Sequence, residues 1–152
     1  MSNKTVKFPT AAKSKNSVYR LGDNPDGVEY FAGAGEYFLI ENRQRTGFDR
    51  YLPGAGLLIW HIEESRSDNT VEKGTKSKHR LVDLEEADGL NDLDHVGLRG
   101  DSGDPFPGKS NNKTFAADGK PNSNWYSKKA SGYAVSSISG SKATMTAKVE
   151  VQ

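Results

Sequence analysis

Hydrophobic and polar residues follow strand-like patterns in two stretches of the first half of the chain. Residues 36–42 (EYFLIEN) are aromatic and β-branched, with glycines before them and polar residues after them, which is typical of a β-strand. Residues 56–64 (GLLIWHIEE) carry apolar side chains at both alternating sets of positions. Since alternate side chains point to opposite faces, this pattern predicts a strand that is buried on both sides.

The C-terminal residues predict a β-hairpin. Residues 132–139 (GYAVSSIS) lead through Gly140 and Ser141 into residues 142–152 (KATMTAKVEVQ). In the second segment apolar and polar residues alternate with a period of two throughout, which is the period of an extended strand. We expect two paired strands, of which the second has one face in solvent.

Shorter segments that also fit strands are residues 6–8, 17–21, 28–31 and 79–87. The last of these has a spacing that fits a helix as well, and the alternation around Val82 and Leu84 favours a strand. Two long stretches, residues 65–78 and 100–131, are rich in Gly, Ser, Asn, Asp, Lys and Pro, which form turns. The sequence therefore predicts a mostly-β fold, an antiparallel β-sandwich with long loops, one of them acidic.

The composition narrows the class of protein. A chain of 152 residues suits one domain, and 34% hydrophobic residues with a mean hydropathy of -0.76 indicate a folded core with long polar loops. The formal net charge is +1, whereas a nucleic-acid-binding surface needs a basic excess. The absence of cysteine excludes disulfides and thiolate zinc sites. We expect neither a membrane span nor a signal peptide, because no long apolar run occurs.

Acidic residues concentrate between residues 82 and 108, where Arg99 is the single Lys or Arg. Like charges at this density repel one another unless a counter-charge neutralises them. Calcium takes six to eight oxygen ligands from carboxylates, amides and backbone carbonyls in flexible loops, so one prediction is a calcium-binding loop. The candidate ligands are Asp83, Glu85, Glu86, Asp88, Asp92, Asp94, Asp101 and Asp104.

This acidic stretch does not fit an EF-hand. Asp92, Asp94 and Gly97 match the first, third and sixth positions of that loop. Val96 and Gly103, however, stand where an oxygen ligand and a bidentate Glu belong, so the calcium loop would be irregular. The alternative is a solvated acidic loop paired with the basic segment before it. The cations of that segment are Arg66, Lys73, Lys76, Lys78 and Arg80.

His61 lies in the sequence WHIEES, which brings a histidine and two carboxylates close together. The H-E-x-x-H helix of a zinc protease needs a second histidine four residues later, where this chain has Ser65. We therefore expect His61 to be a hydrogen-bonded histidine of a strand and not the ligand of a catalytic metal. Signatures of serine hydrolases, nucleotide-binding loops and dinucleotide-binding folds are also absent from the sequence.

Three further features are candidates for binding or for packing. Glu41 and Arg43 end the first strand and need partners if they are buried, which an interdomain contact or a local salt bridge would supply. Trp125 stands in a polar loop, where it would bind a partner surface or cover the core. The DPFPG turn at residues 104–108 is expected to hold Phe106 against the core.

Four motifs follow one another in this chain. They are GEYFLIENRQ at residues 35–44, PGAGLLIWH at 53–61, VDLEEADG at 82–89 and DPFPG at 104–108. The series resembles the segment downstream of the catalytic domain in the immune-inhibitor-A-type secreted metalloproteases of bacteria. The resemblance covers roughly residues 28–151, which it assigns to a noncatalytic β-rich domain, and leaves residues 1–27 as a lead-in that is partly strand.

The resemblance implies a parent protein that is a secreted zinc endopeptidase, whose H-E-x-x-H helix precedes this segment and whose fold is supported by calcium. The family's zinc ligands match nothing in this chain, so zinc would belong only to the parent's catalytic domain. The implied partners are that protease domain and, through it, a protein substrate. The acidic residues that align with the family's motifs are Asp83, Glu85, Glu86, Asp88 and Asp104.

Two functions are expected from these observations. The first is a noncatalytic, calcium-stabilised accessory domain of an extracellular metalloprotease, which supports the fold and helps to position the substrate. The alternative is a self-standing β-sandwich module whose loops around Trp125, Tyr126 and Tyr133 bind carbohydrate or a protein surface. Neither function predicts a nucleic-acid partner or a membrane span.

Overall fold

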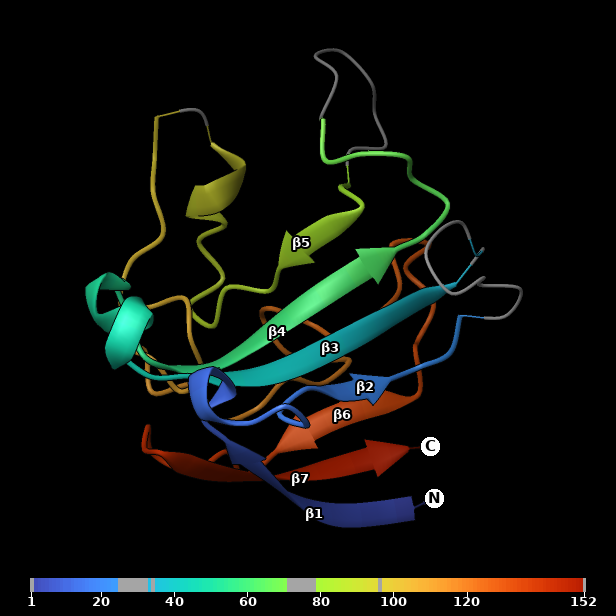
Figure 1. Cartoon of the computed structure of the whole chain (residues 1–152). Coiled ribbons are helices and arrows are strands. Elements are labelled where there is room, and N and C mark those ends of the chain that lie inside the picture. Colours follow the sequence, from blue (N-terminus) through green and yellow to red (C-terminus); the bar gives the residue numbers. More distant parts are fainter. Residues whose placement is uncertain (1, 25–32, 34, 71–78, 96, 152) are drawn as a thin grey trace.

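The chain folds into two antiparallel β-sheets that form a sandwich, as the sequence predicts (Figure 1). The computed structural model describes residues 2–24, 33, 35–70, 79–95 and 97–151. The elements are β1 (Ser2–Pro9), η1 (Ala11–Lys13), β2 (Tyr19–Leu21), β3 (Glu36–Arg43), η2 (Gly47–Tyr51), β4 (Gly56–Glu63), β5 (Val82–Leu84), η3 (Asp92–Asp94), β6 (Tyr133–Ser136) and β7 (Thr144–Val151), where η marks a short 3-10 helix. No helix within the described residues has the length and apolar character that crossing a membrane requires.

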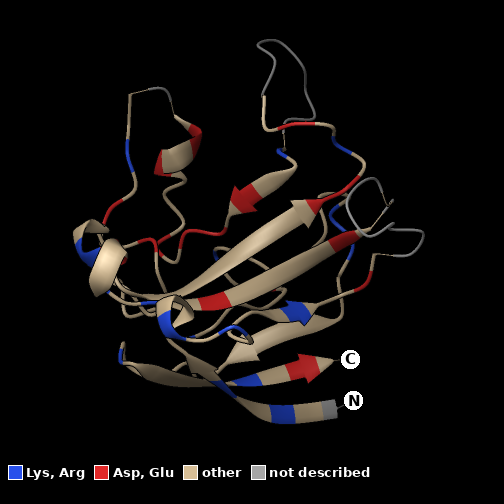
Figure 2. Ribbon diagram, in the orientation of Figure 1, with Lys and Arg blue, Asp and Glu red and all other residues tan. Residues whose placement is uncertain are grey.

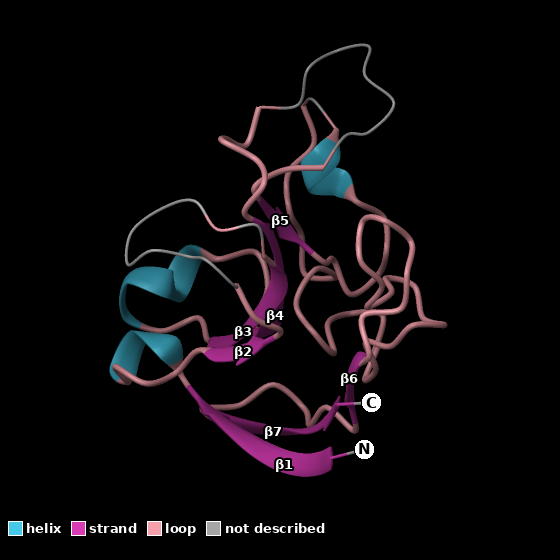
Figure 3. Cartoon of the chain, turned by 90° about the vertical axis from the view of Figure 1, so that its right-hand side faces the viewer, coloured by secondary structure: helices cyan, strands magenta, loops and turns pink. Residues whose placement is uncertain are grey.

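One sheet has the strand order β1-β7-β6 and the other the order β2-β3-β4-β5. Figure 3 shows them as two layers. The long connection between β5 and β6 supplies Phe106 and Phe115 to the core between the sheets. Leu93 and Pro105 of the same connection lie along the other face of the four-stranded sheet, beside Trp60. β1 pairs with β7 along its whole length, from Ser2 opposite Val151 to Pro9 opposite Thr144. Residues before position 28 thus contribute β1 and β2 to the two sheets.

The strand predictions agree with these elements wherever they fall on described residues. The C-terminal hairpin is confirmed, since β6 pairs antiparallel with β7. The ambiguous segment at residues 79–87 contains the strand β5 and no helix, and β5 pairs with β4 at the edge of its sheet. The candidate strand at residues 28–31 lies outside the described residues.

The core lies between the two sheets, on what we call the inner face of the four-stranded sheet. Phe38 is its centre, because its ring contacts the edge of Phe115 at 5.1 Å between centroids and stacks on Trp125 at 5.4 Å. Side chains that join it in the core are Phe8, Ile40, Leu57, Ile59, Phe106, Val135, Met145, Ala147 and Val149. Burying each large apolar side chain in this way contributes about 1.5–3 kcal/mol to folding.

The opposite, outer face of the same sheet is also apolar. The register places Leu39, Trp60 and Leu84 side by side on it, one from each of β3, β4 and β5. These side chains are half-buried, whereas their inner-face neighbours on β3 and β4, Phe38, Ile40, Ile59 and His61, are buried. The prediction that β4 is buried on both sides is therefore met fully on the inner face and only in part on the outer face.

Asn42 joins the two sheets at one end of the sandwich. Its side chain is 0% exposed, and its Nδ2 donates to the carbonyl oxygens of Phe8 at 2.8 Å and Lys142 at 3.0 Å. Its Oδ1 accepts a hydrogen bond from Gln44 Nε2 at 2.8 Å. One amide thus satisfies buried backbone groups that belong to β1 and to the segment before β7.

We predict that Asn42→Ala lowers the free energy of unfolding by about 2–3 kcal/mol, because it leaves buried carbonyl groups without donors. Urea denaturation followed by fluorescence measures this loss. The matched control is Asn3→Ala, which removes an exposed amide from β1 of the other sheet and should change stability by less than about 0.5 kcal/mol. Equal effects of the two variants would contradict the role given to Asn42.

Candidate functional site

Both ends of the acidic loop, defined here as residues 85–106, are attached to β4. The Glu85 N–H donates to the carbonyl of Ile59 at 2.9 Å. Phe106 exchanges two hydrogen bonds with Leu57, both at 2.8 Å, and its side chain is fully buried, as expected for the DPFPG turn. Because its ends lie at neighbouring positions of one strand, the chain between them projects as a closed loop.

Three carboxylates meet at the base of the acidic loop. The Ala87 N–H donates to the Asp104 carbonyl at 2.9 Å and so ties the two ends of the loop together. Around this contact, one carboxylate oxygen from each of Glu86, Asp88 and Asp104 lies within 4.8 Å of the other two. Glu86 is 1% exposed and Asp104 is 5% exposed, so the cluster is largely buried.

Backbone N–H groups of the loop hold all three carboxylates in place. The donors are Asp92 and Leu93 to the two oxygens of Glu86 (2.7 and 2.9 Å), Asp101 to Asp104 Oδ2 (2.7 Å) and Leu90 to Asp88 Oδ1 (3.0 Å). Gly103 is required beside them, because a Cβ at this position would lie 2.0 Å from Asp88 Oδ2. The fold thus brings the carboxylates together with fixed orientations.

The cluster has no partner cation among the residues that the structure describes. Among the ion pairs formed by described residues, none includes Glu86, Asp88 or Asp104. Burial raises the pKa of Asp104 to about 6 and also raises the pKa of Glu86, and neighbouring carboxylates add to both effects. A bound cation would relieve this repulsion.

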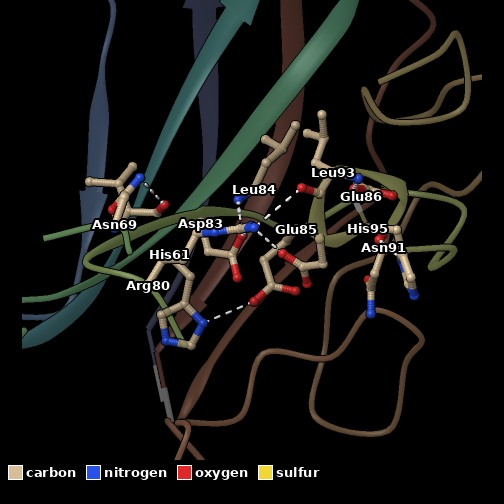
Figure 4. Close-up of polar contacts among 12 residues, drawn as sticks. His61, Asn69, Arg80, Asp83, Leu84, Glu85, Glu86, Asn91, Leu93 and His95 are labelled. Carbon is tan, nitrogen blue, oxygen red and sulfur yellow. Dashed lines mark hydrogen bonds and ion pairs between the residues drawn. The ribbon is translucent and has the colours of Figure 1, made fainter. Parts of the chain in front are cut away.

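The other predicted ligands of the acidic stretch lie elsewhere. Asp83 and Asp94 both pair with Arg80, at 3.3 Å in the case of Asp83 (Figure 4). Glu85 points away from the cluster and contacts His61. Asp101 accepts the N–H of Gly103, and Asp92 enters the cluster through its backbone N–H.

The two predictions for the acidic stretch therefore apply to different residues. Arg80 pairs with part of it, as the alternative of a neutralising basic segment requires. Lys73, Lys76 and Lys78 of that segment lie outside the described residues. Of the eight predicted ligands, Glu86, Asp88 and Asp104 are the ones that converge on a single point.

His61 lies on the inner face of β4 and is hydrogen-bonded through both ring nitrogens. Its Nε2 is 2.8 Å from Glu36 Oε1 and its Nδ1 is 2.9 Å from Glu85 Oε1. Glu36 Oε1 also accepts the N–H of Tyr126 at 2.6 Å. The imidazole thus connects β3, β4 and the start of the acidic loop, and it lies outside the cluster of Glu86, Asp88 and Asp104 whose oxygens are close enough to hold a metal ion.

Tyr126 and Trp125 both use their ring faces for packing inside the protein. The Tyr126 ring lies between His61 and His79, with centroid distances of 4.0 Å to each, and burial raises the pKa of its hydroxyl. Trp125 stacks on Phe38 and meets the edge of Tyr133. Trp125 is therefore a cover over the core. A polar pocket of about 450 Å³ lies beside it, with Asn122, Asn124, Lys128 and Glu85 in its wall.

Glu41 and Arg43 satisfy each other locally. Arg43 Nε lies 3.0 Å from Glu41 Oε2, and Arg43 Nη1 lies 3.1 Å from Asp49 Oδ2. The indole N–H of Trp60 donates to Glu41 Oε1 at 3.0 Å. Of the two alternatives for these residues, the local salt bridge is the one observed, and no interdomain contact is needed to satisfy their charges.

Sequence reasoning missed Glu36 and His79 as parts of a polar and aromatic cluster around His61 and Tyr126. Glu36 is far from both in sequence and reaches His61 because β3 and β4 pair antiparallel, which places the two residues on adjacent strands. The WHIEES pattern pointed to His61 but contained no signal for its partners. Comparisons with protein-family models, curated proteins and solved structures find no match to this chain.

Asp104 predicts a pH dependence of stability in the presence of a chelator. Its pKa is raised from 3.8 to about 6, so its protonated form stabilises the fold fully below about pH 4, and this contribution is lost as the pH rises through 6. Thermal melts in chelator across this range should show a falling unfolding temperature.

The Asp104→Asn variant should flatten this profile, because its side chain stays neutral at every pH. The matched control is Asp118→Asn, which removes an exposed carboxylate and should leave the profile unchanged. A profile that Asp104→Asn does not alter would contradict the assignment.

Proposed function

We propose that this chain is a noncatalytic accessory domain of a secreted, immune-inhibitor-A-type zinc metalloprotease, and that calcium fixes its acidic loop. Hydrolysis would be carried out by a separate protease domain of the parent protein, with which this domain packs and for which it helps to position the protein substrate. The observation that carries the proposal is the buried cluster of Glu86, Asp88 and Asp104.

The donor set fits a hard divalent cation. All three ligating groups are carboxylates, and hard cations such as calcium prefer oxygen ligands at 2.3–2.6 Å. Two ligands of one such ion lie up to about 5 Å apart, which agrees with oxygens found within 4.8 Å of one another. Calcium takes six to eight ligands, so water or backbone carbonyls would complete the shell.

The position of the cluster gives the ion a structural role. The hydrogen bond that closes the loop runs from the Ala87 N–H to the carbonyl of Asp104, and Glu86 directly precedes Ala87. Glu86 also holds η3 through two backbone N–H groups. An ion that bridges these carboxylates would lock the base of the loop and offset the charge repulsion, and it would take no part in chemistry.

The noncatalytic assignment rests on the residues of the chain itself. The sequence contains no H-E-x-x-H motif, and Ser65 stands where a zinc-binding histidine would follow His61. His61 is engaged by Glu36 and Glu85 on its two nitrogens. The resemblance of the four sequence motifs supplies the zinc protease as the parent and the extracellular location.

Carbohydrate binding is less well supported as a function. Sugar recognition by aromatic residues uses exposed ring faces, whereas Trp125 is stacked on Phe38 and Tyr126 lies between two histidines. The pocket beside them is open and has polar side chains in its wall, and the Trp125 and Tyr126 rings that line it are the same ones that stack within the protein. The accessory-domain function is therefore the one we retain.

Calcium should raise the unfolding temperature of the chain by several degrees relative to excess chelator. Binding to the folded state alone stabilises by about 2.7 kcal/mol at a hundredfold excess over the dissociation constant, which is a shift of several degrees for a domain of this size. Magnesium, which prefers smaller octahedral shells, should have a smaller effect. Equal curves with calcium and chelator would refute the calcium site.

Glu86→Gln and Asp104→Asn provide the residue-level test, because each removes one charge at almost constant size. Both should abolish the calcium-dependent shift. In chelator Asp104→Asn should melt no lower than the unmodified chain, since it reduces repulsion within the cluster. Glu86→Gln also removes one of the two oxygens that accept the N–H groups of Asp92 and Leu93, so only its calcium-dependent shift is compared. Asp118→Asn, an exposed acid, should keep the full calcium shift.

We also predict that the purified chain does not hydrolyse casein, with or without added zinc, because it has no set of zinc ligands beside a general base. A fluorescent casein assay measures this. Activity that survives purification and is lost with a zinc chelator would show that the chain is itself a protease. The calcium melts would be unaffected by that result, so the two parts of the proposal can fail separately.

A further inference from the structure

An apolar groove opens on the outer face of the four-stranded sheet, beside η2. Its floor is made by Leu58, Trp60 and Leu84, and its walls by the Leu52–Pro53 segment on one side and Leu93 of η3 on the other. The groove holds about 230 Å³, which is below the usual 300–1,000 Å³ of small-molecule pockets. This size suits a single inserted side chain.

Two aromatic residues project from the protein next to this groove. Phe48 and Tyr51 of η2 are the most exposed large apolar side chains among the described residues, with Phe48 fully exposed and Tyr51 80% exposed. We call this pair the aromatic knob. Tyr51 directly precedes Leu52, which lines the groove, so the knob lies next to the groove.

The two sides of this surface carry opposite charges. Arg45 and Arg50 are exposed beside the knob, and none of the ion pairs of the described residues includes them. Asp101 lines the far side of the groove, and Asp92 directly precedes Leu93 of its wall. Arg99 is the one Lys or Arg of this acidic loop. Figure 2 shows basic residues at η2 and acidic ones at η3, and the loop after η3 has a basic stretch followed by an acidic one.

We propose that this surface binds a second copy of the same chain in a twofold-symmetric dimer, in which Phe48 from the knob of each copy enters the groove of the other. A twofold interface brings the same patch of both subunits together, so the patch must be self-complementary. Here a projection lies next to a recess, and a basic side lies opposite an acidic side. The twofold axis therefore brings the knob of one copy to the groove of the other. It also brings Arg45 and Arg50 of one copy to the acidic loop of the other.

The chain should form a concentration-dependent dimer in sedimentation equilibrium experiments at low salt, and added salt should weaken it. Phe48→Ser should raise the dimer dissociation constant at least about tenfold, as expected for a central aromatic anchor. Because Phe48 is fully exposed, this change leaves the folded monomer intact. Val18→Ser, a matched change of an exposed apolar residue outside this surface, should have no effect.

A mixing experiment tests the reciprocal geometry. Leu93→Ser damages the groove and Phe48→Ser damages the knob, so each variant alone loses both contacts of the dimer. In a heterodimer of the two variants, the intact knob of one meets the intact groove of the other, and one contact remains. The mixture should therefore associate more tightly than either variant by itself.

Three results would overturn the proposal. They are a chain that stays monomeric up to submillimolar concentration, equal effects of Phe48→Ser and Val18→Ser, and a mixture that associates no better than its components. A monomer would leave the surface to a different partner, such as the protease domain of the proposed parent. The dimer does not depend on the proposed function, and the calcium melts test that function separately.

Discussion

The structure depends on the hydrogen bonds along both edges of β4. One edge pairs with β3 over its full length. The other edge is shared in turn by β5, Glu85 and Phe106, which belong to segments that are separate in sequence. Because a strand offers backbone groups at fixed intervals, these attachments set where the acidic loop leaves the sheet and where it returns. These attachments therefore also fix the positions of the carboxylates at the base of the loop and of His61, which contacts Glu85.

The two faces of this sheet are covered to different extents. The inner face is covered by the second sheet and by Phe106 and Phe115 from the long connection, so that Phe38 sits in a closed aromatic core. The outer face has a similar apolar character, but the described residues cover it only in part. An apolar surface that remains open beside projecting aromatic residues is a feature of association sites. The same strand thus builds the core and the surface proposed for dimerisation.

The acidic residues between positions 82 and 108 have different partners in the structure, although they are close in sequence. Arg80 pairs with Asp83 and Asp94, and His61 contacts Glu85, whereas none of the ion pairs among the described residues includes Glu86, Asp88 or Asp104. Burial and mutual repulsion raise the pKa values of Glu86 and Asp104. A bound cation would offset the repulsion that disfavours the charges of Glu86 and Asp104, which is the physical basis of the proposed calcium site.

The sequence by itself determined the β class, the main strands, the C-terminal hairpin and the region in which a cation site was to be sought. These features depend on alternation and composition within short windows, where side-chain direction follows directly from the backbone period. Only the tertiary structure decided which three of the eight acids converge, that Glu36 and Glu85 hold His61, and that Trp125 covers the core. Those contacts join residues that are distant in the chain, and they are fixed by strand register and by loop closure onto β4, which no local pattern encodes.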